Sequence, residues 1–570
     1  MSAIAGRGGS RGLATAAPRP AHAQVQTAEQ LDLRRLLPTL LAGALAAVYV
    51  IVSPPSLDLA AHLFRAKLFR AAGFGVWDNW WYAGHHTPGY SVLFPALAAA
   101  SSPQLVAAIA ATATAAVFEP LARRHFGPDA WLGALWFGLA TATNLYTGRL
   151  TFAFGMLPAV GAALALQRGR PWLAAALALL TALASPVAAL FAALAGAACA
   201  VGRLLGGRDA RPALGGLRAR PALGGLRARP ALAGLGTAAA ALAPLIALAV
   251  AFPEGGSEPF AFTALWPLPL ICLGALCVLP RRERTIRAGA VMYALACIAT
   301  FAVASPVGSN VARLGPLIGG PLAALALWPA RRRLLLLVVI PLLYLQLQAP
   351  VRDVSTAVGD PSASARYWWP LTSFLDRQAG PPFRIEIPFT AFHREVYELA
   401  PRHPLARGWE RQLDIKDDAL FYRGRLTPAR YYEWLHQLAV RFVAVSDARL
   451  DYSAVREQAL IDRGLPYLRL IGRTRHWRIY AVREPTPIVT GAATLSELGP
   501  NSVTLAARRA GSALVRVRFT PYWKLSGAPG CVAPAGDWTR VVLKQAGPTR
   551  LVISFTPARV GARSPRCTKP

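Results

Sequence analysis

The chain has 570 residues, of which 54% are hydrophobic and only 16% are charged, and this balance is too apolar for an ordinary soluble domain. It predicts a polytopic membrane protein that lies in a lipid bilayer. The formal net charge of +33 alone would suit a nucleic-acid partner, but most arginines outside the C-terminal third lie in short clusters between apolar runs. That pattern is typical of the cytoplasmic loops of membrane proteins, so we expect no nucleic-acid partner.

The first part of the chain is predicted to be a tail followed by membrane-spanning helices. Residues 1–36 are rich in Ala, Gly, Arg and Pro and have no apolar core of signal-peptide length, which predicts a disordered cytoplasmic tail. Apolar windows of about 15 to 22 residues predict helices long enough to cross a bilayer. About eleven are expected in a membrane domain over 37–349, near residues 37–53, 90–118, 130–147, 150–167, 171–184, 186–203, 233–252, 262–280, 287–305, 313–329 and 334–349.

Arginine clusters between these helices set the expected orientation in a plasma membrane. With the N-terminus inside, the clusters all fall on the cytoplasmic side, at 123–124, 168–170, 203–229, 281–287 and 331–333. The loops that fall outside are 54–89, 144–150, 253–261 and 306–312, and the chain after residue 349 follows them. One tilted helix over 171–203 would reverse this arrangement, so that stretch is divided at Ser185-Pro186, where proline breaks a helix.

A predicted cytoplasmic loop over 204–232 contains a short repeat. The unit RPALGGLRA recurs nearly three times between Arg211 and Leu235. Nine residues with Gly-Gly and Pro are too few for a solenoid unit, so the repeat is expected to be a flexible linker. Its arginines could also contact lipid headgroups.

Charged residues return after residue 349, and two further domains are predicted outside the cytoplasm, above the first outer loop. Patterns of strand and helix length over 350–484 predict an α/β domain, and short alternating strands over 485–570 predict a β-sandwich. The α/β domain is expected to be non-catalytic, because its acids alternate with arginines, which favours surface or structural ion pairs over a perturbed carboxylate pair. Cys531 and Cys567 could form a disulfide there.

The loop over 54–89 is the expected centre of any chemistry. Asp58 and His62 would share one face of a short amphipathic helix, which could lie along the membrane surface. A general base needs a carboxylate beside an acceptor hydroxyl, and Asp58 would stand at the outer surface for that role. Asp58 could equally be a helix N-cap, and the two roles are compatible. Of the remaining acids before residue 350, only Asp78, Glu254 and Glu258 fall outside, and Asp78 could simply fix a turn.

Aromatic, histidine and arginine side chains supply further candidates. Trp80 and Trp81, with their neighbours Trp77 and Tyr82, suit an interfacial belt, although such rings also stack on sugars. His85 and His86 could bind a phosphate or a metal, or serve the loop alone. Arg149 and Arg313 are isolated cations at outer ends of helices, where a guanidinium can hold a phosphate or reach lipid headgroups. No Cys-x-x-Cys motif or His/Cys cluster suggests a zinc site. A divalent metal is still compatible with the sequence.

The run W-D-N-W-W-Y-A-G-H-H-T-P-G-Y-S-x-L-F-P at 77–95, after an acid just beyond the first span, resembles the GT-C superfamily of membrane glycosyltransferases. Within it the chain is most similar to bacterial membrane proteins labelled 6-pyruvoyl-tetrahydropterin synthase-related; the segments GRLTFAFGMLP, LASPVAALF and LARGWERQLD add to the likeness. The resemblance implies that Asp58 acts as a base or orients the acceptor, and that the donor is a sugar on a polyprenyl phosphate. The chain departs from members with two adjacent acids, because Leu57 and Leu59 flank Asp58.

The sequence therefore predicts a GT-C-like glycosyltransferase of the bacterial cell membrane that moves a sugar from a polyprenyl phosphate to an envelope glycan or lipid. Asp58 would be catalytic. The predicted substrate-binding residues are His62, Asp78, Trp80, Trp81, His85, His86, Arg149 and Arg313. A transporter or flippase is the first alternative, although repeated halves and acids at mid-span are lacking. A scaffold for envelope assembly without catalytic activity is the second.

Overall fold

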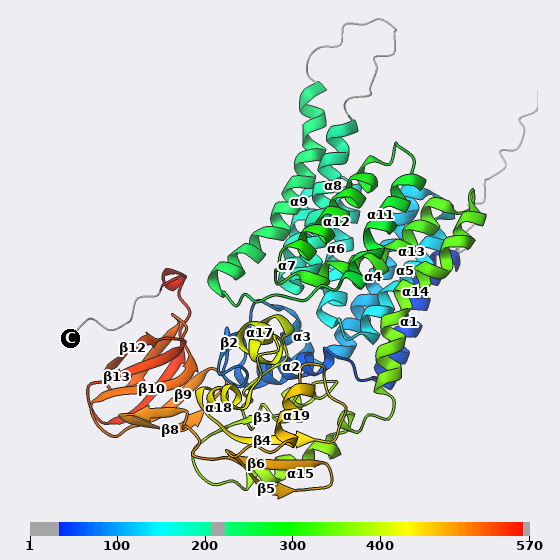
Figure 1. The fold of residues 1–570 in the computed structure, drawn as a ribbon. Coiled ribbons are helices and arrows are strands. Elements are labelled where there is room, and N and C mark those ends of the chain that lie inside the picture. The colour runs from blue at the N-terminus through cyan, green and yellow to red at the C-terminus, as the bar shows by residue number, and fades with distance from the viewer. Residues whose placement is uncertain (1–32, 207–222, 563–570) are drawn as a thin grey trace, which may run out of the picture.

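A computed structural model describes residues 33–206 and 223–562, with a helical bundle on one side and a strand-rich C-terminal part on the other (Figure 1). Most of the predicted tail, residues 207–222 of the repeat loop, and Cys567 lie outside these residues. Helix α1 begins at Leu33, so the last residues of the predicted tail are helical.

The bundle consists of long apolar helices. Eight helices in 33–206 and 223–562 are long and apolar enough to cross a membrane, which supports a polytopic membrane protein, whereas the predicted number of eleven spans is not confirmed. The main helices are α1 (Leu33–Val52), α4 (Pro103–Phe126), α5 (Trp131–Tyr146), α6 (Leu150–Gln167), α7 (Pro171–Ala184), α8 (Pro186–Gly206), α9 (Leu223–Ala251), α11 (Pro267–Val278), α12 (Arg284–Ala302), α13 (Leu314–Leu327) and α14 (Arg332–Ala357).

Several predicted boundaries are wrong. Helix α14 continues to Ala357, beyond the predicted end of the membrane domain at 349, so the first residues of the predicted α/β domain belong to this helix. The span expected at 90–118 is two helices, α3 (Phe94–Ala100) and α4, because the Ser102 hydroxyl caps α4 by accepting from the Leu105 N–H at 3.1 Å, with proline next in the chain. The span expected at 262–280 is divided into α10 (Phe262–Leu265) and α11, which begins at a proline. Helix α9 begins at Leu223, so the described second half of the repeat is helical rather than a linker; alanine and leucine favour the helix there.

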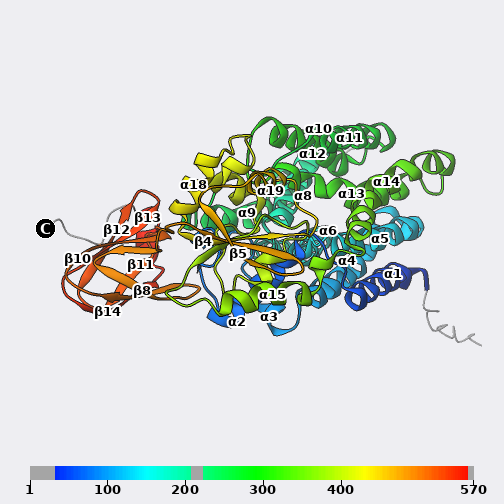
Figure 2. The same ribbon diagram turned by 60° about the horizontal axis from the view of Figure 1, so that its bottom comes forward.

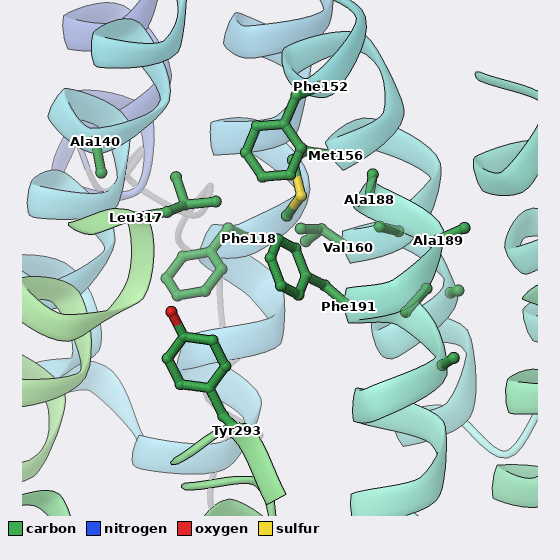
Figure 3. Close-up of a cluster of buried hydrophobic side chains, with 14 of the residues drawn as sticks. Phe118, Ala140, Phe152, Met156, Val160, Ala188, Ala189, Phe191, Tyr293 and Leu317 are labelled. Atoms are coloured by element: carbon green, nitrogen blue, oxygen red, sulfur yellow. The ribbon is translucent and has the colours of Figure 1, made fainter. Parts of the chain in front are cut away.

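Small residues let the helices approach closely. Gly196 of α8 and Gly234 of α9 face each other so closely that a Cβ on either would overlap the backbone of the other helix. Figure 3 shows the aromatic core between the helices, where Phe118, Phe191 and Tyr293 point toward one another. Such packing of small residues with a few large rings is typical of membrane helix bundles.

The helix ends gather on two opposite faces. On one side, the Val92 N–H, just after the 54–89 loop, donates to Leu183 O near the end of α7 at 2.9 Å. On the same side, His62 Nε2 of the loop lies 2.9 Å from Gly148 O, just after α5. We call this side, where the C-terminal part also lies, the loop face (Figure 1). The arginine-rich ends of α4, α6, α8, α12 and α14 form the opposite side, which we call the arginine face. On the arginine face, His125 Nε2 lies 2.7 Å from Glu283 Oε2.

The C-terminal part contains three sheets. The first has the order β3-β4-β6-β5, with β3 parallel to β4 and the other pairs antiparallel, and helices α15 (Ala365–Asp376), α18 (Pro428–Gln437) and α19 (Val455–Asp462) accompany it. Its strands are β3 (Arg384–Glu386), β4 (Val440–Ser446), β5 (Leu468–Arg473) and β6 (Trp477–Val482). Figure 2 shows the other two sheets to one side of it, remote from α1.

Those two sheets are antiparallel, have four strands each, and share one apolar core that includes Val503, Val515 and Trp523. Their orders are β12-β13-β10-β7 and β11-β14-β9-β8. The strands are β7 (Val489–Gly491), β8 (Ala493–Leu498), β9 (Ser502–Ala507), β10 (Gly511–Arg518), β11 (Trp523–Gly527), β12 (Gly530–Ala535), β13 (Trp538–Leu543) and β14 (Gly547–Ile553).

The 54–89 loop is buried between the bundle and the C-terminal part. Its helix α2 (Leu59–Ala72) carries Phe64, on which the Trp81 ring stacks with centroids 3.9 Å apart. The Trp81 indole N–H donates to Val396 O at 3.3 Å, and Trp80 O accepts from Leu405 N–H at 2.8 Å. These rings and α2 therefore belong to the core of the first C-terminal sheet unit. An interfacial belt, a sugar-stacking surface and a helix on the membrane surface do not fit this burial.

Candidate functional site

Asp58 lies at the loop face with a carboxylate that is not used to cap its helix. It occupies the N-cap position of α2, but its side chain makes no capping hydrogen bond. The carboxylate is half-exposed, and its Oδ1 accepts a hydrogen bond from the Trp409 indole N–H at 3.3 Å. The prediction that Asp58 occupies an N-cap position is thus correct, but its side chain does not make the capping hydrogen bond. The carboxylate remains available to another partner.

Trp409 brings the C-terminal part into this site. Its ring stacks on His393 with centroids 3.3 Å apart, and the Arg411 guanidinium lies 4.4 Å from the ring centroid on the same indole. Arg411 is itself fixed by a bidentate pair with Asp451 at 3.1 and 2.7 Å. The indole is therefore held rigidly, so the hydrogen bond to Asp58 has a defined direction.

His62 positions a neighbouring turn rather than presenting a free ring. It is buried, and its Nε2 lies 2.9 Å from Gly148 O. Burial lowers the pKa of His62 to about 4, so the ring is neutral near pH 7 and Nε2–H is the donor. Gly148 has φ 73°, and a Cβ there would overlap the Ser56 hydroxyl. Together these contacts hold the turn that carries Arg149 against the residues just before Asp58.

Arg149 and Arg313 are two half-exposed guanidiniums at the loop face. Within residues 33–206 and 223–562, neither side chain makes a hydrogen bond or an ion pair. Burial, together with the charge of Arg313, lowers the pKa of Arg149 to about 10, and the carboxylates of Asp58 and Asp353 oppose the shift. Two guanidiniums that repel each other and have no anionic partner form a favourable place for an anion.

Glu258 supplies a second carboxylate. It comes from the loop between α9 and α10, where its Oε1 accepts from the Ser309 hydroxyl at 3.2 Å. Burial raises the pKa of Glu258, Arg313 lowers it and Asp58 raises it. Asp58, Glu258, Arg149 and Arg313 thus act on one another electrostatically, yet none of them forms an ion pair among the described residues. We call these four residues the charge cluster.

The charge cluster combines a proton acceptor with two anion-binding groups. Asp58 can accept a proton from a hydroxyl, and the two guanidiniums can hold a phosphate through several N–H groups. In the described part of the chain no group of three or more His, Cys, Asp or Glu is arranged to hold a metal ion. A divalent metal at the cluster would therefore rely on Asp58 and Glu258, with oxygen atoms from a bound phosphate completing its shell.

No known protein family matches this chain, and no curated protein matches it. The assignment of function therefore rests on the charge cluster and on the surrounding fold.

The other predicted site residues lie in the buried part of the 54–89 loop. Asp78 fixes a turn by accepting from the Trp80 N–H at 3.1 Å, and its Oδ2 lies 3.7 Å from the His85 Nδ1. Burial raises the pKa of Asp78 to about 8 and lowers the pKa of His85 to about 4. The carboxyl group is thus largely protonated at neutral pH, which suits a structural turn better than binding of a cation.

His86 links three parts of the chain. Its Nδ1 is 2.7 Å from Glu254 Oε1, its backbone N–H donates to the same carboxylate, and its Nε2 is 3.0 Å from the Thr520 hydroxyl. The ring therefore ties the 54–89 loop to the α9–α10 loop and to the two C-terminal sheets. Its partners are all side chains of the protein, and both ring nitrogens are engaged.

The acids of the C-terminal sheet unit form buried ion pairs. Arg407 lies 2.7 Å from Asp414, 3.4 Å from Glu457 and 3.8 Å from Glu386, and all four side chains are buried. The predicted structural ion pairs are confirmed, but they are not at the surface. The prediction that no carboxylate pair is perturbed is wrong, because burial raises the pKa of Glu457 to about 7 and that of Glu386 well above its ordinary value.

Replacing Asp78 by Asn should change how stability depends on pH. Because the folded-state pKa of Asp78 is raised from 3.8 to about 8, the wild-type protein should lose stability as the pH rises through this window. The Asn variant has no such proton to lose. Its melting temperature relative to wild type should therefore increase between about pH 5 and pH 8, measured by tryptophan fluorescence in detergent. Asp537→Asn, at an exposed position, is the control. A constant difference across this range would contradict a protonated Asp78.

Proposed function

We propose that the chain is a membrane glycosyltransferase of the GT-C type that moves a sugar from a polyprenyl-phosphate donor to a cell-envelope acceptor at the outer face of the plasma membrane. The observation that carries this proposal is the charge cluster. It places a half-exposed carboxylate, which does not cap its helix, near two guanidiniums that make no side-chain hydrogen bond or ion pair in the described residues.

In the proposed reaction an acceptor hydroxyl attacks the anomeric carbon of the donor sugar. The oxygen–carbon bond of the product forms as the bond from that carbon to the phosphate oxygen breaks, and the hydroxyl proton passes to Asp58. Arg149 and Arg313 stabilise the charge that develops on the departing polyprenyl phosphate. Charge and protons balance without a further reactant.

Several features of the fold support this assignment. The charge cluster lies at the starts of α2, α6 and α13, where Trp409 of the C-terminal part contacts Asp58, so it stands between the apolar helices and the C-terminal part. Trp409 fixes one oxygen of Asp58 from that part. The second oxygen of Asp58 makes no hydrogen bond in the described residues and is the one that could accept the acceptor proton.

The direct test is transfer by the purified protein in lipid nanodiscs. Labelled polyprenyl-phosphate sugars are supplied with envelope lipid extracts, and mass spectrometry follows the label. A product in which the label has moved to an envelope glycan or lipid is the expected result. Movement of intact lipid-linked sugar across liposomes without a product would favour a transporter instead. Glycan binding with neither activity would favour a scaffold.

The proposed orientation has its own test. Residues 358–562 should be digested by protease added to right-side-out vesicles and protected in inside-out vesicles, because arginine-rich loops favour the cytoplasmic side. Fragments can be identified by mass spectrometry. The repeat loop, with its many arginines, serves as the internal control with the opposite pattern. Digestion of residues 358–562 only in inside-out vesicles would overturn the orientation and place the charge cluster on the cytoplasmic side.

A further inference from the structure

A cavity of about 480 Å³ lies in the half of the bundle next to the arginine face. Helices α4, α6, α8, α11, α12 and α13 surround it, and its lining is almost wholly apolar. Along α6 the lining side chains run from Met156 to Gln167, and along α4 from Phe118 to Phe126. Both runs end at the arginine face, and on α13 the lining begins at Leu314, directly after Arg313, so the cavity extends from the neighbourhood of the charge cluster to the arginine face.

Aromatic rings and the first residues of α13 line the end of the cavity nearest the loop face. Phe118, Phe191 and Tyr293 line its inner end, and Figure 3 shows these rings converging across the bundle. The Tyr293 hydroxyl is fixed, because it donates to Val311 O at 3.0 Å and accepts from the Gly315 N–H at 2.9 Å. A headgroup held at the arginine face would therefore be far from Asp58. The headgroup site at Arg203 therefore lies at the opposite end of the cavity from the charge cluster.

The end of the cavity at the arginine face is polar. Arg203 lines it, is exposed, and makes no side-chain hydrogen bond or ion pair among residues 33–206 and 223–562. Gln167 lines the same end; its amide donates to Leu121 O at 3.1 Å, whereas its buried Oε1 has no partner there. A free cation and an unused acceptor thus border an apolar chamber.

We infer that this cavity binds one anionic glycerophospholipid of the adjoining leaflet. An apolar chamber of this size does not hold water favourably, so an acyl chain is the occupant that its wall suits. The lipid phosphate would lie at Arg203, as expected for a cation at the bilayer surface, and a headgroup hydroxyl could donate to Gln167 Oε1. This inference does not depend on the proposed transfer reaction.

Two variants test the site with matched controls. Gly289 lines the cavity, and a Cβ there would make only an ordinary contact, 3.5 Å from Ala198, so leucine at this position should fill the chamber. Gly236→Leu is the control, because this exposed glycine of α9 has no neighbour within 4 Å and does not line the cavity. Arg203→Gln removes the phosphate partner, and Arg170→Gln at an exposed position of the same face is its control.

Binding is measured by native mass spectrometry of the full chain in detergent with phosphatidylglycerol or phosphatidylcholine. The wild type should retain one phosphatidylglycerol and bind phosphatidylcholine more weakly. Gly289→Leu should abolish retention, and Arg203→Gln should weaken it about tenfold, as for the loss of one hydrogen bond to a charged group. Phosphatidylglycerol should raise the melting temperature of the wild type but not that of Gly289→Leu.

Equal retention by Gly289→Leu and Gly236→Leu would show surrounding bilayer lipid only and would overturn the inference. If Gly289→Leu does not fold, Arg203→Gln decides the question: retention of phosphatidylglycerol equal to that of Arg170→Gln would also overturn it. Equal binding of the two lipids by the wild type would also overturn the inference, because both carry a phosphate and only phosphatidylglycerol has a net negative charge and headgroup hydroxyls.

Discussion

Replacing Asp58 by Asn is expected to lower sugar transfer by about 10²- to 10⁴-fold, the usual range for loss of a general base. The amide has the same shape as the carboxylate, and its oxygen can still accept from the Trp409 indole, but it cannot take a proton from the acceptor. Folding should be little changed, because the Asp58 side chain does not cap α2. The measurement is the initial rate of label transfer in nanodiscs.

Asp129→Asn is the matched control for this variant. Asp129 is exposed near the start of α5 at the arginine face, so the same chemical change there should leave transfer intact. Melting temperatures of both variants show whether folding is preserved. Transfer by Asp58→Asn within about threefold of wild type would exclude Asp58 as the general base, because a base contributes far more.

Removing Arg149 and Arg313 should also cause a large loss of transfer. Each Arg→Gln change should lower kcat by about 10²- to 10³-fold, as for a donor that stabilises charge in the transition state, and the double variant should lose more. Lys at either position should restore part of the rate, because it keeps the charge but not the bidentate geometry. Rates at saturating donor separate this effect on kcat from weaker donor binding.

Loss of either guanidinium should not lower the melting temperature, in contrast to loss of one partner of a buried ion pair. Arg149 is half-buried without an anionic partner in the described residues, so Arg149→Gln should keep or slightly raise the melting temperature while transfer falls. Arg168→Gln, at an exposed position of the arginine face, is the control for both readouts. A lower melting temperature with unchanged transfer per folded protein would assign Arg149 and Arg313 a structural role instead.

Helix positions in the bundle were predictable where glycine or proline marks the ends of the helices. The spans expected at 150–167 and 171–184 coincide with α6 and α7, because Gly148 and Gly169 adopt positive φ beside them and Pro171 begins α7. The same kind of signal was missed at Phe94-Pro95 and Ser102-Pro103, which divide the stretch expected at 90–118. Proline after a capping residue starts a helix even inside a continuous apolar run.

The candidate site was predictable only in part. Asp58, Arg149 and Arg313 stood out because each is an isolated charge beside an apolar run, and the structure brings them together with Glu258. The hydrogen bond from Trp409 to Asp58 spans 351 positions in sequence, so no local pattern indicates it. The burial of Trp80 and Trp81 depends equally on distant segments. A local sequence pattern does not indicate which distant segment will cover a loop.

The burial of the 54–89 loop under the C-terminal part has a consequence for biosynthesis. Trp81 and the Val396 carbonyl that it contacts are 315 positions apart. At a synthesis rate of about 5 to 20 residues per second, the tryptophan leaves the ribosome about 15 to 60 s before its partner exists. During that interval most helices of the bundle must be inserted while the loop remains uncovered. These rings therefore stay without their native cover until the chain beyond Val396 has been made, with 174 residues still to follow that position.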